Sequence, residues 1–174
     1  QGADVDAFGV GERLITSKAE PVFGGVYKLT AIEKKGQIIP KIKLSENVTK
    51  ITTPGVKKLW RLYRRDDDKA IADVITKYDE FIDETSPYEI FHSEHTWKRK
   101  TIVDFYAKPL LERIFDKGEC VYFNDGLNSI RNRCAANLNC LWEEVKRFEN
   151  PHEYYVDLSF QLWNLKNDML KIYS

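Results

Sequence analysis

The sequence is poor in methionine and cysteine and contains no long hydrophobic run. Its single methionine is Met169, and its three cysteines are Cys120, Cys134 and Cys140. An odd number of cysteines without Cys-x-x-Cys spacing argues against a disulfide framework and is typical of reduced thiols in a cytoplasmic protein. No apolar stretch approaches the ~18 residues that a membrane span needs. These absences predict a cytoplasmic protein that does not cross a membrane.

The sequence also lacks an excess of either charge, which limits its partners. Its 27 lysines and arginines are balanced by 27 aspartates and glutamates. Proteins that bind nucleic acid or membrane surfaces broadly depend on a basic excess, so we expect neither as a partner. The short run Trp97-Lys98-Arg99-Lys100 leaves a local nucleic-acid patch open as an alternative, through base stacking and phosphate contacts.

Apolar residues are present in the proportion that a folded domain needs. They make up 43% of the 174 residues, enough for a core without disulfides or a metal. Strands are predicted up to residue 123 and helices beyond it, which is the α+β fold class. Pro40 lacks an N–H group, so its strand should lie at a sheet edge. Three pairs of β-rich runs predict hairpins: 22–33 with 37–44, 56–64 with 69–76, and 110–115 with 119–123.

Two helices are predicted after residue 123. Apolar residues recur at three- and four-residue steps over 127–148, which places them on one face of a helix. Asn124 or Asp125 should cap its first turn, and Asp157 or Ser159 should cap a second helix. The two apolar faces predict an antiparallel helical hairpin that packs on the sheet.

Glycines near the N-terminus are candidates for binding phosphate. Gly9 and Gly11 flank Val10 after a short β-rich run, and glycines let backbone N–H groups approach an anion. Glu12 would repel a phosphate unless it points away or pairs with Arg13. The alternative interpretation of this segment is a plain turn.

A second candidate for phosphate binding lies in residues 41–55. Lys43 and Lys50 contribute ammonium groups and Ser45 contributes a hydroxyl group, which together can hold phosphate oxygens. The alternative is a solvated hairpin loop.

Two clusters of potential metal ligands have simpler explanations. His92 and His95, with Glu89 or Glu94, have a spacing that a metal would allow, but structural histidines are the expected alternative. The three adjacent carboxylates at 66–68 point in different directions on a turn, which favours a solvated turn. We therefore predict no metal site. The sequence contains no complete catalytic set, Walker loop or Rossmann fingerprint, so no catalytic residue is assigned.

Taken together and in order, these segments resemble the C-terminal part of bacterial nicotinate phosphoribosyltransferases. The likeness runs over nearly the whole chain and rests on the joint order of short strings. The strings are Asp6-Ala7-Phe8-Gly9-Val10-Gly11, Pro21-Val22-Phe23-Gly24-Gly25-Val26-Tyr27-Lys28-Leu29, Lys43-Leu44-Ser45-Glu46-Asn47, His95-Thr96-Trp97-Lys98-Arg99-Lys100, Leu141-Trp142-Glu143-Glu144-Val145-Lys146-Arg147 and Asn150-Pro151-His152-Glu153-Tyr154-Tyr155-Val156-Asp157-Leu158.

The resemblance implies an enzyme that makes nicotinate mononucleotide and pyrophosphate from nicotinate and phosphoribosyl pyrophosphate. The resemblance also implies that the enzyme hydrolyses ATP, requires Mg²⁺ and serves NAD salvage in the cytoplasm. It implies a homodimer whose subunits contain the irregular α/β barrel of type II phosphoribosyltransferases. It assigns phosphate binding to Gly9, Val10 and Gly11, and to Lys43, Ser45 and Lys50. The catalytic histidine and the nicotinate-binding arginine would lie upstream, so none of His92, His95 or His152 is assigned that role.

The absence of an initiator methionine before Gln1 fits the interpretation that the chain is part of a longer enzyme. On this view residues 1–20 are a barrel strand with its phosphate loop, 21–123 a β-rich part and 124–174 the helical hairpin. The chain alone is then predicted to be inactive, with no cofactor tightly bound. The alternative is a stand-alone module that binds phosphate or nucleotides without transferase activity.

Overall fold

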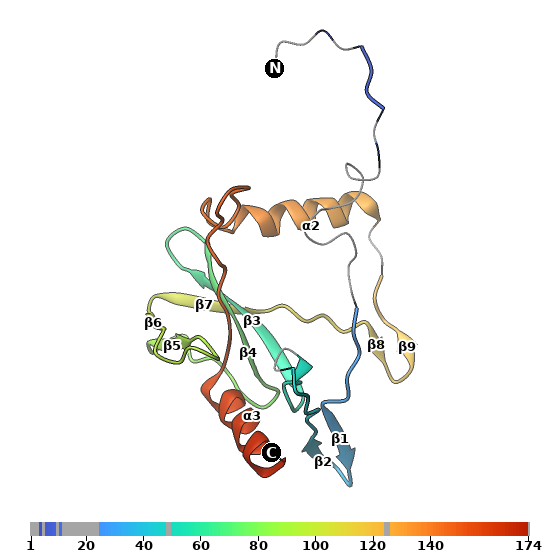
Figure 1. The fold of residues 1–174 in the computed structure, drawn as a ribbon, viewed down its shortest axis with the longest axis vertical. Coiled ribbons are helices and arrows are strands. Elements are labelled where there is room, and N and C mark those ends of the chain that lie inside the picture. The colour runs from blue at the N-terminus through green and yellow to red at the C-terminus, as the bar shows by residue number, and fades with distance from the viewer. Residues whose placement is uncertain are drawn as a thin grey trace.

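A four-stranded sheet forms the centre of the computed structural model of this protein (Figure 1), which describes residues 4, 6–9, 11, 25–47, 50–123 and 126–173. The strand order is β10-β4-β3-β7. β3 (Lys57–Arg64) pairs antiparallel with both β4 (Ala70–Lys77) and β7 (Phe105–Pro109). β10 (Val156–Leu158) joins β4 in parallel. The sheet therefore combines a local hairpin with a strand from near the C-terminal end of the chain.

In the part of the chain that the structure describes, three small hairpins surround this sheet. Lys35 and Gly36 both have positive φ, 51° and 76°, and so do Lys117 and Gly118, 49° and 88°. Two such residues in a row form the type of two-residue turn that matches the twist of the flanking strands. The hairpins are β1 (Ala31–Lys34) with β2 (Gln37–Pro40), β5 (Tyr88–Phe91) with β6 (Arg99–Ile102), and β8 (Phe115–Asp116) with β9 (Glu119–Cys120).

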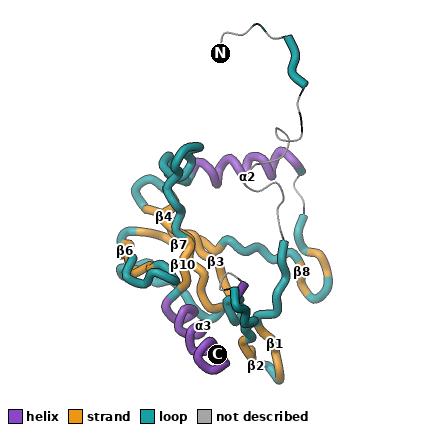
Figure 2. Tube along the Cα trace, viewed as in Figure 1, coloured by secondary structure: helices purple, strands orange, loops and turns teal. Residues whose placement is uncertain are grey.

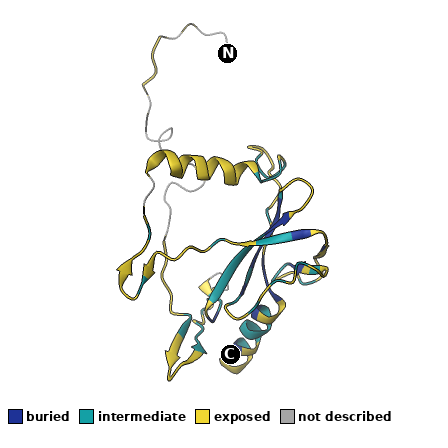
Figure 3. Cartoon of the chain, turned by 180° about the vertical axis from the view of Figure 1, so that it is seen from behind, coloured by how far each residue is buried: buried dark blue, intermediate teal, exposed yellow. Residues whose placement is uncertain are grey.

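The two α-helices of the described residues lie on opposite sides of the central sheet (Figure 2). α2 (Leu127–Asn139) crosses one end, and α3 (Phe160–Tyr173) packs against β4 at the other. Burial follows the same division (Figure 3), because the helix residues that are buried belong to α3. The core itself is formed by apolar side chains from β3, β4, β5, β6 and β7, namely Leu62, Ile71, Ala72, Val74, Ile90, Ile102 and Phe105.

The structure confirms the α+β class and the general positions of the hairpins. The predicted pair 56–64 with 69–76 is present as strands at 57–64 and 70–77, and Pro40 ends a strand of a two-stranded sheet. The predicted strand over 22–33 is described only from residue 25, and it is regular only at 31–34. The sequence analysis missed β5, β6, β7 and β10.

The first helix ends at Asn139, so its predicted extension to residue 148 is wrong. The cause lies in the contacts of its last carbonyl groups. Lys69 donates its ammonium to the carbonyl oxygens of Asn139 and Leu141 at 2.6 and 3.4 Å, and the Ala70 N–H donates to Cys140 at 2.8 Å. These groups satisfy carbonyls that a longer helix would bond internally.

The helix starts also differ from prediction. The residue before α2 is Gly126, which forms no side-chain cap, while Asn124 and Asp125 lie outside the described residues. Ser159 caps α3 as predicted, since its hydroxyl accepts from the Leu162 N–H at 3.2 Å. Asp157 instead lies in β10.

The two helices do not form the predicted antiparallel hairpin. β10 and the irregular segment before it separate α2 from α3 along the chain, and β10 places residues 156–158 in the central sheet. The three-part division at residues 20 and 123 remains a prediction. Within the described part of the chain, no helix has the length and apolar character needed to cross a membrane.

Candidate functional site

A pocket of about 780 Å³ lies beside the central sheet. One wall is the β5–β6 hairpin with its loop, and the other is the irregular segment that leads into β10. Trp142, in the turns that follow α2, completes it. We call this hollow the β5–β6 pocket. Its lining consists of Ile90, Phe91, His92, Ser93, Lys98, Arg99, Lys100, Trp142 and residues 151–157.

A hydrogen-bonded network fixes the segment before β10 to the sheet. Asp73 in β4 accepts from Arg61 Nε at 2.8 Å and Nη2 at 2.9 Å, and from the Tyr154 hydroxyl at 2.9 Å. Burial, followed by the Asp73 charge and the hydrogen bond to it, raises the pKa of Tyr154. The hydrogen bond to Asp73 raises the pKa of Arg61. Tyr154 therefore remains a neutral hydrogen-bond donor.

The cationic wall of the pocket is formed by the end of the β5–β6 loop and the start of β6. Arg99 pairs with Glu89 on the neighbouring strand, and its guanidinium lies 5.5 Å from the Phe91 ring centroid. The Lys100 ammonium lies 5.2 Å from the ring centroid of Trp142 and 5.8 Å from that of Tyr155. Lys100 thus sits beside two aromatic faces that also line the pocket.

Asp157 is the buried carboxylate of the pocket. It is 5% exposed, and no donor bonds its side chain among the residues that the structure describes. Burial raises its pKa, the charge of Glu153 adds to that effect, and His92 opposes it. Every fully buried side-chain oxygen in the described residues has a hydrogen-bond partner, so the Asp157 carboxylate still reaches solvent beside the pocket that it lines.

The two histidines of the β5–β6 loop interact with each other and with the backbone. Their rings stack with centroids 4.8 Å apart. The Nδ1 atom of His92 accepts from the N–H groups of Glu94 and His95 at 3.2 and 3.0 Å. Glu89, one proposed co-ligand, is paired with Arg99 instead. This arrangement fits the structural alternative.

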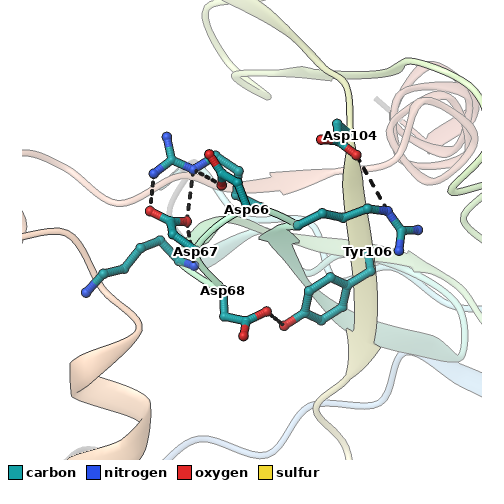
Figure 4. Close-up of polar contacts among 8 residues, drawn as sticks. Asp66, Asp67, Asp68, Asp104 and Tyr106 are labelled. Atoms are coloured by element: carbon teal, nitrogen blue, oxygen red, sulfur yellow. Dashed lines mark hydrogen bonds and ion pairs between the residues drawn. The ribbon is translucent and has the colours of Figure 1, made fainter.

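The carboxylates at 66–68 are also occupied by protein partners (Figure 4). Asp66 and Asp67 both pair with Arg64, and Asp68 accepts from the Tyr106 hydroxyl at 2.8 Å. The hydrogen bond from Arg64 lowers the pKa of Asp67 to about 2. In the described ranges no group of three or more His, Cys, Asp or Glu residues could hold a metal ion.

Lys43, Ser45 and Lys50 share one loop. The Lys43 N–H donates to the Thr52 hydroxyl at 2.9 Å, and the Ser45 hydroxyl accepts from the Asn47 N–H at 3.3 Å. The Lys50 N–H donates to the Asn47 carbonyl at 2.9 Å, and both lysine side chains are exposed. The loop is therefore locally ordered and its cations are available to solvent.

The glycine candidates are separate from this loop. A Cβ atom built on Gly9 or Gly11 would meet no atom within 4 Å, and Val10 lies outside the described residues. In Figure 1 the described residues before Gly11 lie beyond α2, while β1 and β2 occupy the opposite end. The structure does not bring the two predicted phosphate segments together.

Sequence reasoning missed the β5–β6 pocket because its walls come from distant segments. Asp157 was expected to be a helix cap, and the run 141–148 was expected to be helical. The one available signal was composition. Aromatic and charged residues are both present in 97–100 and in 152–157, but only the parallel pairing of β10 with β4 places the two runs side by side.

Comparisons with known proteins agree on one family. A family model described as the nicotinate phosphoribosyltransferase C-terminal domain matches residues 56–166. Nicotinate phosphoribosyltransferase of Bacillus subtilis (strain 168) is 43% identical over 166 residues, covering 95% of this chain and 34% of the relative. The Caenorhabditis elegans protein of the same name is 33% identical, covering 94% of this chain and 28% of the relative.

A solved structure is similar in fold. The crystal structure of human nicotinic acid phosphoribosyltransferase aligns with a TM-score of 0.61 and 24% identity, over 68% of this chain and 24% of the human chain. At that identity the likeness concerns the fold alone. The chain spans about a third of the length of the curated relatives it matches.

Proposed function

The chain belongs to the nicotinate phosphoribosyltransferase family, and on that premise we propose that it is the C-terminal part of such an enzyme. The enzyme would form nicotinate mononucleotide and pyrophosphate from nicotinate and phosphoribosyl pyrophosphate, with ATP hydrolysis, in NAD salvage. The observation that most strongly supports this proposal is the 43% identity over 95% of this chain. Isolated motifs would not produce a match of that extent.

We propose that the chain contributes phosphate contacts rather than the reacting groups. Backbone N–H groups around Gly9, Val10 and Gly11 would bind one phosphate, and Lys43, Ser45 and Lys50 would bind phosphate oxygens from the 41–52 loop. The exposed lysines support the second assignment, since their charges are free to approach an anion. A longer enzyme would have to bring the two segments together.

Mg²⁺ belongs to the proposed reaction, but the described residues do not fit a metal centre. The carboxylates at 66–68 are bound to Arg64 and Tyr106, and no other suitable cluster of three is present in the described ranges. We derive no step through the metal for this chain. ATP, a homodimer and a cytoplasmic location complete the proposal.

The test compares two proteins. One is a protein of the relatives' length that ends with this sequence, and the other is the 174-residue chain. Nicotinate mononucleotide formation is measured with nicotinate, phosphoribosyl pyrophosphate, ATP and Mg²⁺. We expect turnover by the longer protein only. Turnover by the short chain would contradict the prediction that this chain alone is inactive. No turnover by the longer protein would contradict the proposed activity.

Single-charge variants of the longer protein test the phosphate assignment. Lys43→Ala and Lys50→Ala should each raise the KM for phosphoribosyl pyrophosphate several-fold, because each removes a charge-assisted contact. Lys34→Ala, an exposed lysine on the neighbouring β1–β2 hairpin, is the matched control. Equal KM values in all three variants would remove the 41–52 loop from the site.

A second candidate function is the stand-alone binding module. The β5–β6 pocket, with its volume of about 780 Å³, favours it, since this lies within the range of small-molecule sites. A module of this kind needs no upstream partner. It would bind ligand as the short chain, whatever the activity of the longer protein.

A further inference from the structure

The starting point is a largely buried aspartate whose carboxylate has no protein donor among the described residues. Asp157 is 5% exposed and lines the β5–β6 pocket, and no hydrogen bond or ion pair of its side chain joins it to the described part of the chain. Its position is fixed, because β10 pairs with β4 at Asp157 and Val74. Its oxygens still reach solvent, because every fully buried side-chain oxygen in the described residues has a partner, so water or a donor on a ligand can compensate the charge. A ligand in the pocket would supply such a donor.

The opposite wall offers positive charge. Arg99 is neutralised by Glu89, but Lys98 and Lys100 have no carboxylate partner within the described ranges. The Lys100 ammonium lies beside the rings of Trp142 and Tyr155. An anionic group would therefore find two unneutralised ammonium groups on the side of the pocket formed by the loop and β6.

Aromatic faces complete the chemistry of the pocket. Trp142 and Tyr155 line it next to Lys100, so a planar ring bound here can stack on either face. Tyr155 is carried by the segment that Asp73 anchors through Tyr154 and through the Asp73 N–H, which donates to the Tyr155 carbonyl at 2.9 Å. The stacking surface thus rests on the rigid sheet.

We propose that the β5–β6 pocket binds a ribonucleoside phosphate. Asp157 accepts from the ribose hydroxyls, Lys98 and Lys100 bind the phosphate, and Trp142 or Tyr155 stacks on the base. A carboxylate is the group that recognises ribose hydroxyls in dinucleotide-binding folds. Asp157 would repel a simple anion, and the lysines would repel a simple cation. The proposal stands on the pocket alone and goes beyond the proposed enzyme activity.

The first experiment uses the unmodified chain with chosen probes. Calorimetry measures binding of AMP, 2′,3′-dideoxy-AMP, inorganic phosphate and a six-residue oligoadenylate. AMP should bind saturably, and the dideoxy analogue should bind roughly tenfold more weakly, because it lacks the donors to Asp157. No AMP binding, or phosphate binding as tightly as AMP, would overturn the proposal. Tighter binding of the oligoadenylate would assign the patch to RNA instead.

Variants then locate the contacts. Asp157→Asn should lower AMP affinity roughly tenfold and change dideoxy-AMP affinity little. Lys100→Ala should weaken AMP but not adenosine. Glu94→Gln, an exposed carboxylate of the same loop outside the lining, is the matched control. Circular dichroism checks that each variant folds. If Asp157→Asn weakens AMP and dideoxy-AMP equally, the ribose contact is wrong.

Discussion

α2 and α3 are both amphipathic in sequence, yet only one of them reaches the core. α3 packs on β4 and buries Leu162 and Met169, whereas α2 buries no residue. Leu138 of α2 is 50% exposed although it lies on the predicted apolar face. An apolar stripe therefore identifies the face of a helix that needs a partner, but the rest of the fold decides whether the described chain supplies one.

The two helices also differ in how they are attached. α3 follows directly from β10 and is capped by Ser159, whose own N–H donates to the Ile75 carbonyl in β4 at 2.8 Å. α2 is held mainly by polar contacts at its C-terminal end. Lys69 donates to the carbonyl of Asn139, the last residue of α2, at 2.6 Å, and Arg61 Nη1 donates to the Asn137 side-chain oxygen at 3.4 Å. Apolar burial stabilises one helix, and hydrogen bonds position the other.

The largest expected effect is a difference in stability between matched leucine substitutions in α3 and α2. Leu162→Ala should lower the free energy of unfolding by about 2–5 kcal/mol, because the side chain is fully buried and leaves a cavity. The matched change in α2, Leu138→Ala, should cost less than ~1 kcal/mol. Urea denaturation of both variants measures the difference. Equal costs would mean that α2 is buried in solution.

The second prediction concerns the polar attachment. Asp73→Asn should cost about 2–3 kcal/mol, because it weakens charge-assisted bonds to Arg61 and leaves that guanidinium poorly compensated. Hydrogen exchange should accelerate in the last turn of α2, which Arg61 contacts through Asn137. The control Glu89→Gln removes an exposed pair with Arg99 and should cost under ~1 kcal/mol. Unchanged exchange in α2 would contradict this attachment.

Local patterns account for what the sequence predicted correctly. β3 and β4 form a hairpin across residues 65–69, and β8 and β9 join through Lys117-Gly118, so neighbours in sequence are neighbours in space. The cap at Ser159 is equally local. Such features depend on turn chemistry and short-range hydrogen bonds, which a sequence displays directly.

The errors arise where distant segments meet. The pattern over 127–148 is helical in period, but Lys69 and Ala70 bind the carbonyls at 139–141 and end α2. Asp157 looks like a cap until β10 pairs with β4. For the phosphate candidates, the sequence grouped Gly9 and Gly11 with Lys43 by analogy, and the described contacts do not join them. Their role stays a prediction.

A smaller effect is expected at the helix starts. Ser159→Ala removes the hydroxyl that accepts from Leu162 and donates to Glu80 at 2.8 Å, and it should cost about 1 kcal/mol. Ser129→Ala, in the first turn of α2, is the matched control and should change the free energy of unfolding by less than ~0.5 kcal/mol, since that serine is not the capping residue. Thermal melts distinguish them. A larger loss of stability in Ser129→Ala than in Ser159→Ala would contradict this prediction.

The smallest expected effect is a gain in stability that depends on pH. Burial and Glu153 raise the pKa of Asp157 in the folded state, against the opposing charge of His92. The folded state therefore binds the Asp157 proton more tightly than the unfolded state, whose pKa is about 3.9. Its stabilising contribution is full below that value and is lost as pH rises through the folded pKa.

Asp157→Asn removes this dependence. Relative to the unmodified chain, the variant should gain free energy of unfolding at pH 7 and none near pH 3, where the carboxyl group is largely protonated in both states. Urea denaturation at several pH values measures the difference, with Glu94→Gln as the control. A loss of stability at pH 7 would mean that the carboxylate has a protein partner in solution. A gain, together with weaker AMP binding, would show that β10 places Asp157 for a ligand at the expense of the fold that α3 and the sheet stabilise.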